Sequence, residues 1–296
     1  ADGKTGHSVP LPPWFETSGK KVAIIGAGPA GLAAVRELKR YGHEVTVLDR
    51  AATPGGQMRA IPAFRLPVEV VNEDVAAIVD SGITLRLGES VDATRLLELH
   101  KEFDAVLLAA GTNKPVALTL PGLTAGAAVD GLQFMLRYAA GYPPEVSGNT
   151  LIIGGGFTAV DCARAARRLL GDSDNVTIMY RRGVAQMAAT PEELEALHEE
   201  KICVETLVSP VAAIVENGRI RAVVFERNLL GEPDESGKPR FIPIPDSRYE
   251  VPCDTLVIAI GQTREPGLLP DDVSRCEESH ATSLPGVYAV GDIVRG

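Results

Sequence analysis

Two stretches of the chain repeat one pattern of apolar and small residues. An apolar run at 22–25 leads into the glycines of GAGPAG (26–31), and a second at 151–153 leads into GGGFTA (154–159). After each glycine turn the residues are rich in alanine, and LAAVRELKR and AVDCARAARRLL contain no glycine, which favours helix. Each stretch therefore predicts a strand, a tight turn and a helix.

The match extends beyond the glycines. HEVTVLDR (43–50) matches NVTIMYRR (175–182), and FDAVLLAAGT (103–112) matches CDTLVIAIGQ (253–262). Strands that alternate with helices in this order form parallel sheets with crossover helices. We expect an α/β fold of two Rossmann-like, three-layer dinucleotide-binding domains, the second inserted in the first. The expected boundaries are an extended lead-in at 1–20, an outer domain at 21–145 and 263–296, and an inserted domain at 146–262.

The second unit is longer because residues 211–251 intervene. Asn217-Gly218 lies between alternating apolar runs, which predicts a tight hairpin, and GEPDESGKP (231–239) predicts a longer turn. These residues indicate a small antiparallel meander. Before it, Thr190-Pro191-Glu192-Glu193 has the capping pattern of a helix that runs through Glu200. We interpret both inserts as scaffold.

Composition and charge narrow the class of protein. The 296 residues carry a formal net charge of -10, which opposes sequence-independent binding of nucleic acid, and no apolar run approaches the length of a membrane span. The four cysteines are widely spaced, with no C-x-x-C pair and no metal-binding cluster. We interpret them as reduced thiols, mostly buried, in a cytoplasmic protein that binds no metal, membrane or nucleic acid.

The first glycine turn has the spacing Gly26-x-Gly28-x-x-Gly31 between a strand and a helix. Backbone N–H groups and the helix dipole can there face a pyrophosphate, which approaches closely because side chains are missing. Asp49, at the end of the second strand, can accept hydrogen bonds from both ribose hydroxyls of an adenosine. A chance glycine turn in an ordinary βαβ unit is the alternative.

The second glycine turn, Gly154-x-Gly156-x-x-Ala159, differs at the tip of the next strand. Tyr180 occupies the position of Asp49, and Arg181 and Arg182 follow it. A guanidinium can bind a ribose 2′-phosphate through charge-assisted hydrogen bonds, whereas a carboxylate would repel it. We therefore expect this site to prefer NADP(H); two solvated arginines at a strand end are the alternative. One site for a flavin and one for a nicotinamide would explain the duplication.

Five ordered motifs carry a resemblance to a known family. They are KVAIIGAGPAGLAA, PGGQMRAIPAFRLP (54–67), IIGGGFTAVDCARAA, YRRGVAQMAATPEE and TSLPGVYAVGD (282–292). Together they resemble the flavoprotein part of the glutamate synthase small (beta) subunit, a module that also occurs in NADH-dependent ferredoxin:NADP oxidoreductase and dihydropyrimidine dehydrogenase. The resemblance implies FAD in the outer domain, NADPH in the inserted domain and hydride transfer from nicotinamide to flavin. It also implies an electron-accepting domain or subunit that contains iron-sulfur clusters.

The resemblance assigns residues to both cofactors and names no catalytic side chain, because the cofactors carry the chemistry. The residues expected around FAD are Gly26, Gly28, Pro29, Ala30, Gly31, Asp49, Arg50, Gly56, Gln57, Arg65, Ala110, Gly111, Thr112, Gly291 and Asp292. Those expected around NADPH are Gly154, Gly156, Phe157, Thr158, Ala159, Arg181 and Arg182, with Gly261 and Gln262 at the nicotinamide end.

The sequence departs from the family pattern at both ends. The family generally carries an N-terminal iron-sulfur domain, and it continues beyond Gly291-Asp292 into a helix that faces the flavin phosphate, whereas four residues follow here. We expect an excised piece of a longer protein with weak or no retention of FAD. A nucleotide-binding assembly module without turnover is therefore an alternative. Two other enzyme classes have a similar layout of two nucleotide sites. A disulfide reductase would need a pair of thiols beside the flavin, and the sequence offers none. A flavin monooxygenase would be distinguished by consumption of oxygen and hydroxylation of a substrate.

Overall fold

The computed structural model describes residues 15–171, 173–234, 237–269 and 279–295. Most of the expected lead-in at 1–20 lies outside the described residues. The chain divides into two compact units, and each is described by itself. Unit 1 comprises the residues up to 59, 63–114 and those from 262 onward; unit 2 comprises 60–62 and 115–261.

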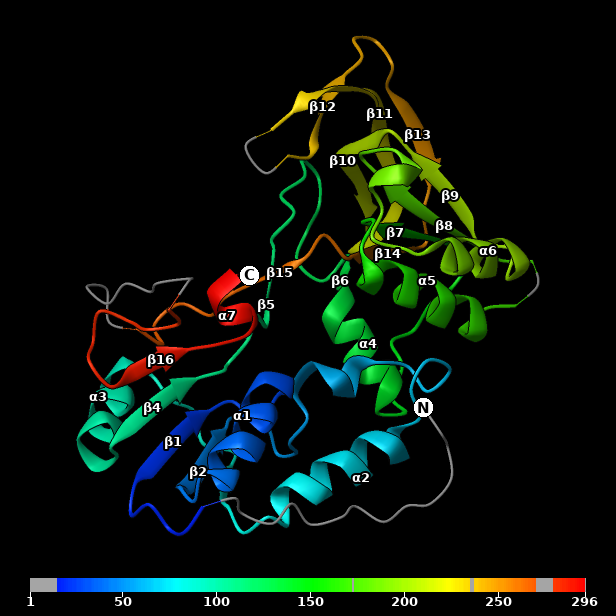
Figure 1. Ribbon diagram of the computed structural model, residues 1–296. Helices are drawn as coiled ribbons and strands as arrows, with labels where there is room; N and C mark the ends of the chain where they lie inside the picture. The colour runs from blue at the N-terminus through cyan, green and yellow to red at the C-terminus, as the bar shows by residue number, and fades with distance from the viewer. Residues whose placement is uncertain (1–14, 172, 235–236, 270–278, 296) are drawn as a thin grey trace. The chain divides into compact units, whose positions relative to one another are not determined.

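Unit 1 contains a five-stranded parallel sheet in the order β16-β4-β1-β2-β3. Its strands are β1 (Lys21–Ile25), β2 (Glu44–Asp49), β3 (Thr84–Leu87), β4 (Ala105–Leu108) and β16 (Val287–Ala289). Helix α1 (Pro29–Arg40) and helix α2 (Val68–Val79) lie over one face, while α3 (Ala93–Glu102) and α7 (Asp292–Arg295) pack on the other (Figure 1). The central strand β1 is buried on both faces after its first residue, and β4 is buried on one face and half-buried on the other, as expected for parallel strands between helices.

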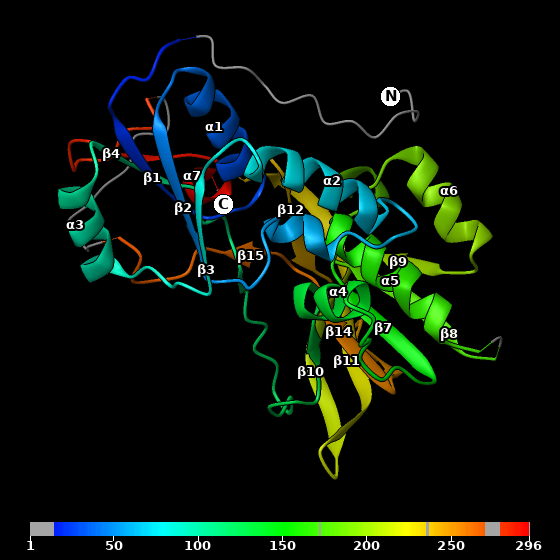
Figure 2. The ribbon, with the colours of Figure 1, turned by 90° about the horizontal axis from the view of Figure 1, so that it is seen from below.

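Unit 2 repeats this topology in the order β6-β14-β7-β8-β9, again with all pairs parallel. The strands are β6 (Val129–Asp130), β7 (Asn149–Ile153), β8 (Asn175–Tyr180), β9 (Cys203–Thr206) and β14 (Thr255–Ile258). Helices α4 (Gly131–Ala139) and α5 (Phe157–Leu169) pack on one face of the sheet, as seen in Figure 2. Helix α6 (Pro191–Glu199) has the predicted Thr190 capping box and ends at Glu200.

The antiparallel meander forms the third layer of unit 2. It contains β10 (Val208–Glu216), β11 (Arg219–Pro233), β12 (Pro239–Pro243) and β13 (Tyr249–Pro252), with β11 in the middle. Phe225, Val223 and Ile220 of β11 pack on Leu151 and Met179 of the parallel sheet. Asn217 and Gly218 both have positive φ, as the predicted tight hairpin requires. The longer turn predicted at 231–239 includes residues 235 and 236, which lie outside the described residues.

Equivalent hydrogen bonds confirm the repeat residue by residue. The Gly26 N–H donates to Leu48 O at 2.8 Å, and the Gly154 N–H donates to Met179 O at 3.1 Å. The hydrogen bonds at the first residues of β1 and β7 are equivalent as well. Asp104 accepts from the Lys21 N–H at 2.9 Å, and Asp254 accepts from the Asn149 N–H at 2.8 Å. The expected fold class, two Rossmann-like domains with one inserted, is confirmed.

The first boundary of the inserted unit differs from the expected one. Residues 115–145 group with unit 2, not with unit 1, because Val129 and Asp130 of β6 pair with β14. A two-residue strand carries almost no sequence signal of its own, and its partner lies more than a hundred residues away. The return crossing at 261/262 lies next to the expected position, and there β15 (Gln262–Thr263) pairs with β5 (Lys114–Pro115).

The described residues include three of the four cysteines, and their helices can be compared with the length of a membrane span. Cys162 and Cys253 are buried and Cys203 is exposed, all three as free thiols, while Cys276 lies outside the described residues. Burial raises the pKa of the Cys253 thiol to about 12. No helix in the described part of the chain is long and apolar enough to cross a membrane.

Candidate nucleotide-binding sites

The first glycine turn joins β1 to α1 with very close backbone packing. Gly26 has φ +112°, and a Cβ there would lie 2.4 Å from the Ala109 carbonyl oxygen. A Cβ at Gly31 would lie 1.9 Å from the Gly26 carbonyl oxygen. Pro29 occupies the first turn of α1, where its missing N–H costs nothing, and Ala30 follows it. Side chains are thus excluded at positions 26 and 31 of the turn.

A third backbone segment adds to this cradle. Gly56 begins the 3-10 helix η1 (Gly56–Ala60), has φ +55°, and would place a Cβ 2.7 Å from Gly28 Cα. The Gly55 N–H donates to Ala27 O at 2.8 Å. Glycines from two separate loops therefore meet over the N-terminus of α1. This geometry suits a pyrophosphate that must approach backbone amides closely.

Asp49 lies at the end of β2, as predicted. Its Oδ2 accepts the Ala27 N–H at 2.7 Å, and its Oδ1 accepts the Ala51 N–H at 2.7 Å. Each carboxylate oxygen can accept a second hydrogen bond. Asp49 therefore fixes the turn and keeps acceptor capacity for ribose hydroxyls. Its neighbour Arg50 forms a half-exposed ion pair with Glu265 at 2.9 Å, so its side chain is tied to the return segment of unit 1.

The residues expected beside the flavin come together through Gln57. The Gln57 side-chain amide donates to the Thr112 carbonyl oxygen, and Thr112 is buried. Asn113 closes the same loop by donating to Ala110 O at 2.9 Å, and Gly111 has φ +65° with open space where a Cβ would project. Arg59 donates to Pro54 O at 2.9 Å and to the Asn72 side chain. Arg65 is exposed and also makes an interaction.

The C-terminal motif returns to the first glycine turn. Gly291 has φ +74°, and a Cβ there would lie 2.8 Å from the Ala30 Cβ, so this segment passes directly over the start of α1. Asp292 begins α7, whose Ile293 and Val294 are buried in the core with Leu96 and Leu99. Asp49, Gly56, Ala110 and Gly291 of unit 1 thus come together around one helix N-terminus.

The second glycine turn joins β7 to α5 in the same way. Gly154 has φ +147°, and a Cβ would lie 2.2 Å from Ala259 O, the counterpart of the Gly26 approach to Ala109. Ala159 is fully buried under the turn. At Gly156 a Cβ would meet nothing within 4 Å, and Phe157 is 52% exposed. With Thr158 in the first turn of α5, this N-terminus is open where a pyrophosphate would bind.

Tyr180 replaces the carboxylate of the first unit with a packed ring. Its Oη donates to Gln186 O at 2.9 Å, and a Cβ at Gly155 would lie 2.4 Å from its ring. The middle glycine of GGG is therefore needed for packing against Tyr180. The end of β8 therefore carries no carboxylate at the position that Asp49 occupies in unit 1.

The two arginines after Tyr180 have different surroundings. Arg181 is exposed, and its guanidinium lies 4.7 Å from the centroid of the Phe241 ring. Arg182 is buried, with Nε donating to Pro239 O at 2.7 Å and Nη2 donating to Asp234 at 3.3 Å. Sequence reasoning treated the pair as equivalent. The side chain of Arg182 is instead engaged within the meander, which leaves Arg181 as the one that solvent or a ligand can reach.

Gly261 and Gln262 lie at the crossing between the units, where Gly261 has φ +116°. The Val116 N–H donates to Gly261 O at 3.0 Å, which ties the two crossing segments together. Gly261 is therefore required by its backbone conformation, whichever ligand group approaches it.

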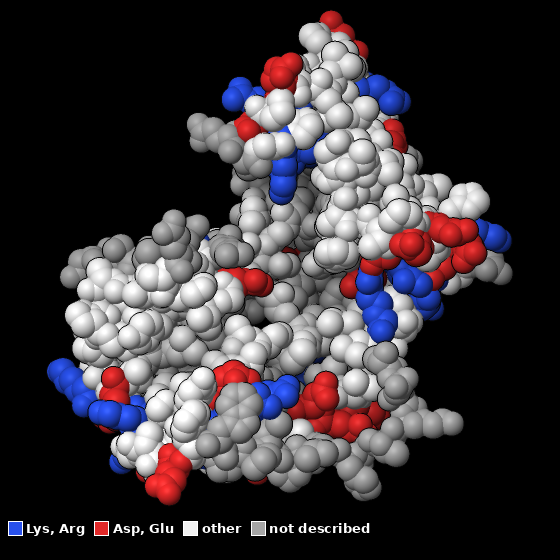
Figure 3. Space-filling model, viewed as in Figure 1, with Lys and Arg blue, Asp and Glu red and all other residues white. Residues whose placement is uncertain are grey.

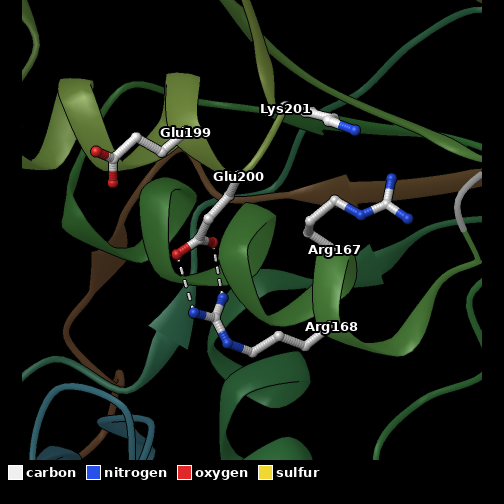
Figure 4. A pocket seen from close by; sticks show the side chains of 5 residues that line it. All are labelled: Arg167, Arg168, Glu199, Glu200 and Lys201. Carbon is white, nitrogen blue, oxygen red and sulfur yellow. Dashed lines mark hydrogen bonds and ion pairs between the residues drawn. The ribbon is translucent and has the colours of Figure 1, made fainter.

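A shallow pocket of about 350 Å³ lies elsewhere on unit 2, where α5 meets the end of α6. Its lining residues are Arg167, Arg168, Glu199, Glu200 and Lys201 (Figure 4). Glu200 accepts from Arg164 at 2.7 Å and from Arg168 at 2.7 Å. Acidic and basic side chains lie side by side over this region in Figure 3. Three of the lining residues are basic and two are acidic, and none of the predicted nucleotide ligands lines the pocket.

Sequence reasoning missed the meander residues that contact the arginine pair. Phe241, Asp234 and Asn228 all lie 47 or more positions after Arg181. Asn228 is buried and donates to the Arg181 carbonyl oxygen at 3.1 Å. Local patterns in 228–241 predict strands and a turn, and they contain no signal that relates these side chains to Arg181.

The comparisons with known proteins match this geometry. Residues 20–296 match the family described as pyridine nucleotide-disulphide oxidoreductase. The chain belongs to this family. It is 35% identical to a putative glutamate synthase [NADPH] small chain of Cereibacter sphaeroides, over 99% of this chain and 75% of the relative. The resemblance to the glutamate synthase small-subunit family is confirmed.

Another relative is much longer than this chain. The beta subunit of the NADP(+)-dependent formate dehydrogenase of Moorella thermoacetica is 36% identical over 95% of this chain, which spans only 41% of the relative. Among solved structures, Mycobacterium tuberculosis FprA in complex with NADPH aligns with a TM-score of 0.79 at 20% identity, covering 94% of this chain and 79% of that one. That likeness bears on the fold alone.

Proposed function

We propose that this chain is an FAD-dependent oxidoreductase module that receives a hydride from NADPH and passes electrons to a partner. The observation that carries the proposal is the duplication itself: two glycine turns with equivalent backbone hydrogen bonds end in unlike strand tips, Asp49 in one unit and Tyr180 with Arg181 in the other. A carboxylate suits ribose hydroxyls, and an exposed guanidinium suits a 2′-phosphate. Membership of the pyridine nucleotide-disulphide oxidoreductase family supports the same pairing of nucleotides.

In unit 1, the glycines at 26, 28 and 56 and the N-terminus of α1 would hold the FAD pyrophosphate, and Asp49 would hold the ribose. The glycines let three backbone segments pack closely around this N-terminus, because a Cβ at Gly26 or Gly56 would strike backbone atoms. Gln57, by bonding to Thr112 O, would set the distance between the two loops that flank the flavin. Asp292 and Gly291 would close over the start of α1.

In unit 2, Gly156 and Thr158 would hold the NADPH pyrophosphate, and Arg181 would bind the 2′-phosphate. When bound, the two nucleotides supply the redox chemistry, a hydride that moves from nicotinamide to flavin. The protein supplies alignment and electrostatics, so no side chain of this chain needs to act as nucleophile or general acid.

We also propose a protein partner. The relatives include subunits named for formate dehydrogenase and glutamate synthase, and the chain spans 41% of the former. These names support an electron-accepting domain or subunit, for which iron-sulfur clusters are the proposed acceptors. A cytoplasmic location follows from the same proposal, because the nicotinamide nucleotides are there.

The direct test is anaerobic reduction of the chain after reconstitution with FAD. We expect the visible absorption of the flavin to be bleached far faster by NADPH than by NADH. Equal rates with both would contradict the assignment of Arg181. A protein that binds both nucleotides and leaves the flavin oxidised would instead favour the nucleotide-holding assembly module.

A further inference from the structure

The arginine segment at the end of β8 is held by the antiparallel meander at several points. Asn228 Nδ2 donates to Arg181 O at 3.1 Å, and the Leu207 N–H donates to Arg182 O at 3.0 Å. Leu207 adopts φ +59°, which is unusual for a branched residue, and it accepts the Asn228 N–H at 2.7 Å. The backbone of the pair is therefore fixed by Asn228 of the meander and by Leu207, which joins β9 to β10.

The side chains are fixed by the β11–β12 hairpin. Arg182 donates to Pro239 O and to Asp234, and both acceptors flank the turn of this hairpin. The Arg181 guanidinium lies over the Phe241 ring at 4.7 Å, and Arg182 lies 6.0 Å from the same ring. A long flexible side chain that is stacked on a ring loses less freedom when it binds a ligand.

The charges around the pair do not cancel among the described residues. Asp234 pairs with Arg182, whereas Arg181 forms no ion pair with any described residue. Partial desolvation of its guanidinium, together with the neighbouring charge of Arg182, lowers the pKa of Arg181 from its ordinary value. In the described part of the chain, Asp234 is the one carboxylate that forms an ion pair with the two arginines, which leaves the charge of the exposed Arg181 without an ion-pair partner there. A phosphate dianion would offset that charge.

We propose that Phe241 is a specificity-determining residue, which positions the Arg181 guanidinium for the ribose 2′-phosphate and so sets the preference for NADPH. The inference rests on the proposed function and extends it from the glycine turn to the meander. Phe241 acts through Arg181 and does not contact the reacting atoms. The sequence analysis interpreted the meander as scaffold. In this proposal the meander also determines how the 2′-phosphate is recognised, because it contains Phe241.

The test uses binding rather than flavin reduction. Isothermal titration calorimetry of the full chain measures the dissociation constants of adenosine 2′,5′-bisphosphate and 5′-AMP. These two ligands differ only in the 2′-phosphate. We expect Phe241→Leu to weaken binding of the bisphosphate about fivefold, as expected for loss of one cation–π contact, and to leave 5′-AMP unchanged. Phe241→Tyr keeps a ring and should retain the wild-type preference.

Ile242→Ala is the matched control, because Ile242 is the next residue of β12, is 50% exposed and pairs with Leu229. It should leave both affinities at the wild-type values. If Phe241→Leu keeps the full preference, or weakens both ligands equally, the inference about Phe241 is wrong while the proposed function stands. If the wild-type chain itself shows no preference for the bisphosphate, the assignment of Arg181 fails, and the role of Phe241 fails with it.

Discussion

The Asp49 carboxylate accepts the Ala27 N–H at 2.7 Å, which joins the tip of β2 to the middle of the first glycine turn. In unit 2 the equivalent strand tip carries Tyr180, whose ring packs against Gly155 instead. The same backbone therefore presents an acceptor in one unit and an apolar surface followed by cations in the other. The two units differ chemically where an adenosine ribose would bind.

Replacing Asp49 tests the acceptor. Asp49→Ala removes a charged partner of the ribose and of the Ala27 N–H, so we expect FAD binding to weaken about 10- to 100-fold. Quenching of flavin fluorescence on titration measures the dissociation constant. Asp80→Ala is the control, since Asp80 is an exposed carboxylate at the end of α2 in the same unit. Unchanged FAD affinity in Asp49→Ala would remove Asp49 from the site.

Two glycines of the second turn should respond differently to alanine. Gly154→Ala adds a Cβ 2.2 Å from Ala259 O at φ +147°, so we expect a loss of stability of about 2–4 kcal/mol. Gly156→Ala adds a Cβ in open space at φ -95°, so stability should change by less than about 1 kcal/mol.

The same pair separates folding from binding. Because the open space at Gly156 is where the pyrophosphate would lie, Gly156→Ala should weaken NADPH binding at least about tenfold. Thermal unfolding and calorimetry on the two variants give both quantities. A Gly156→Ala variant that binds NADPH as tightly as the wild type would show that the nucleotide does not approach this turn.

Glu200 provides a test by pH. Burial alone would raise the pKa of Glu200. Its pKa nevertheless lies below the ordinary value, because Arg168 and Arg164 donate hydrogen bonds to its carboxylate. A lowered folded pKa gives stability that is present above the ordinary glutamate pKa and is lost as the pH falls through the folded value. We expect Glu200→Gln to lower stability at neutral pH by about 2 kcal/mol, and the deficit to shrink in acid.

Glu199→Gln is the matched control for this measurement, because Glu199 precedes Glu200 and is exposed (Figure 4). Thermal unfolding at a series of pH values should show little change for Glu199→Gln at any pH. A deficit for Glu200→Gln that stays constant into acid would mean that the carboxylate charge contributes nothing.

The sequence predicts much of this architecture because the signals for it are local. The glycines at 26 and 154, the alanine-rich helices after them, the Asn217-Gly218 hairpin and the Thr190 capping box each follow from neighbouring residues, and the structure has all of them. The grouping of residues 115–145 with unit 2 depends on a two-residue strand that pairs at long range. A strand of two residues is too short to show an alternation of apolar and polar positions.

The division between Arg181 and Arg182 escapes sequence reasoning for a similar reason. Both residues are arginines at one strand end, so no local pattern separates them. Asp234 and Pro239 bury Arg182 from a hairpin more than fifty positions away, and Phe241 stacks on Arg181 from the same hairpin. The surroundings of the two arginines are therefore set by the inserted meander, whose sequence by itself predicts only strands and turns.

The assignment of one nucleotide to each unit is tested most directly by hydrogen–deuterium exchange of the full chain with FAD and with NADP+ added separately. We predict that FAD slows exchange of the backbone amides at 26–31 and leaves those at 154–159 unchanged, and that NADP+ does the reverse. Protection of the same glycine turn by both nucleotides, or protection by NADP+ that leaves 154–159 exchanging as before, would contradict the account.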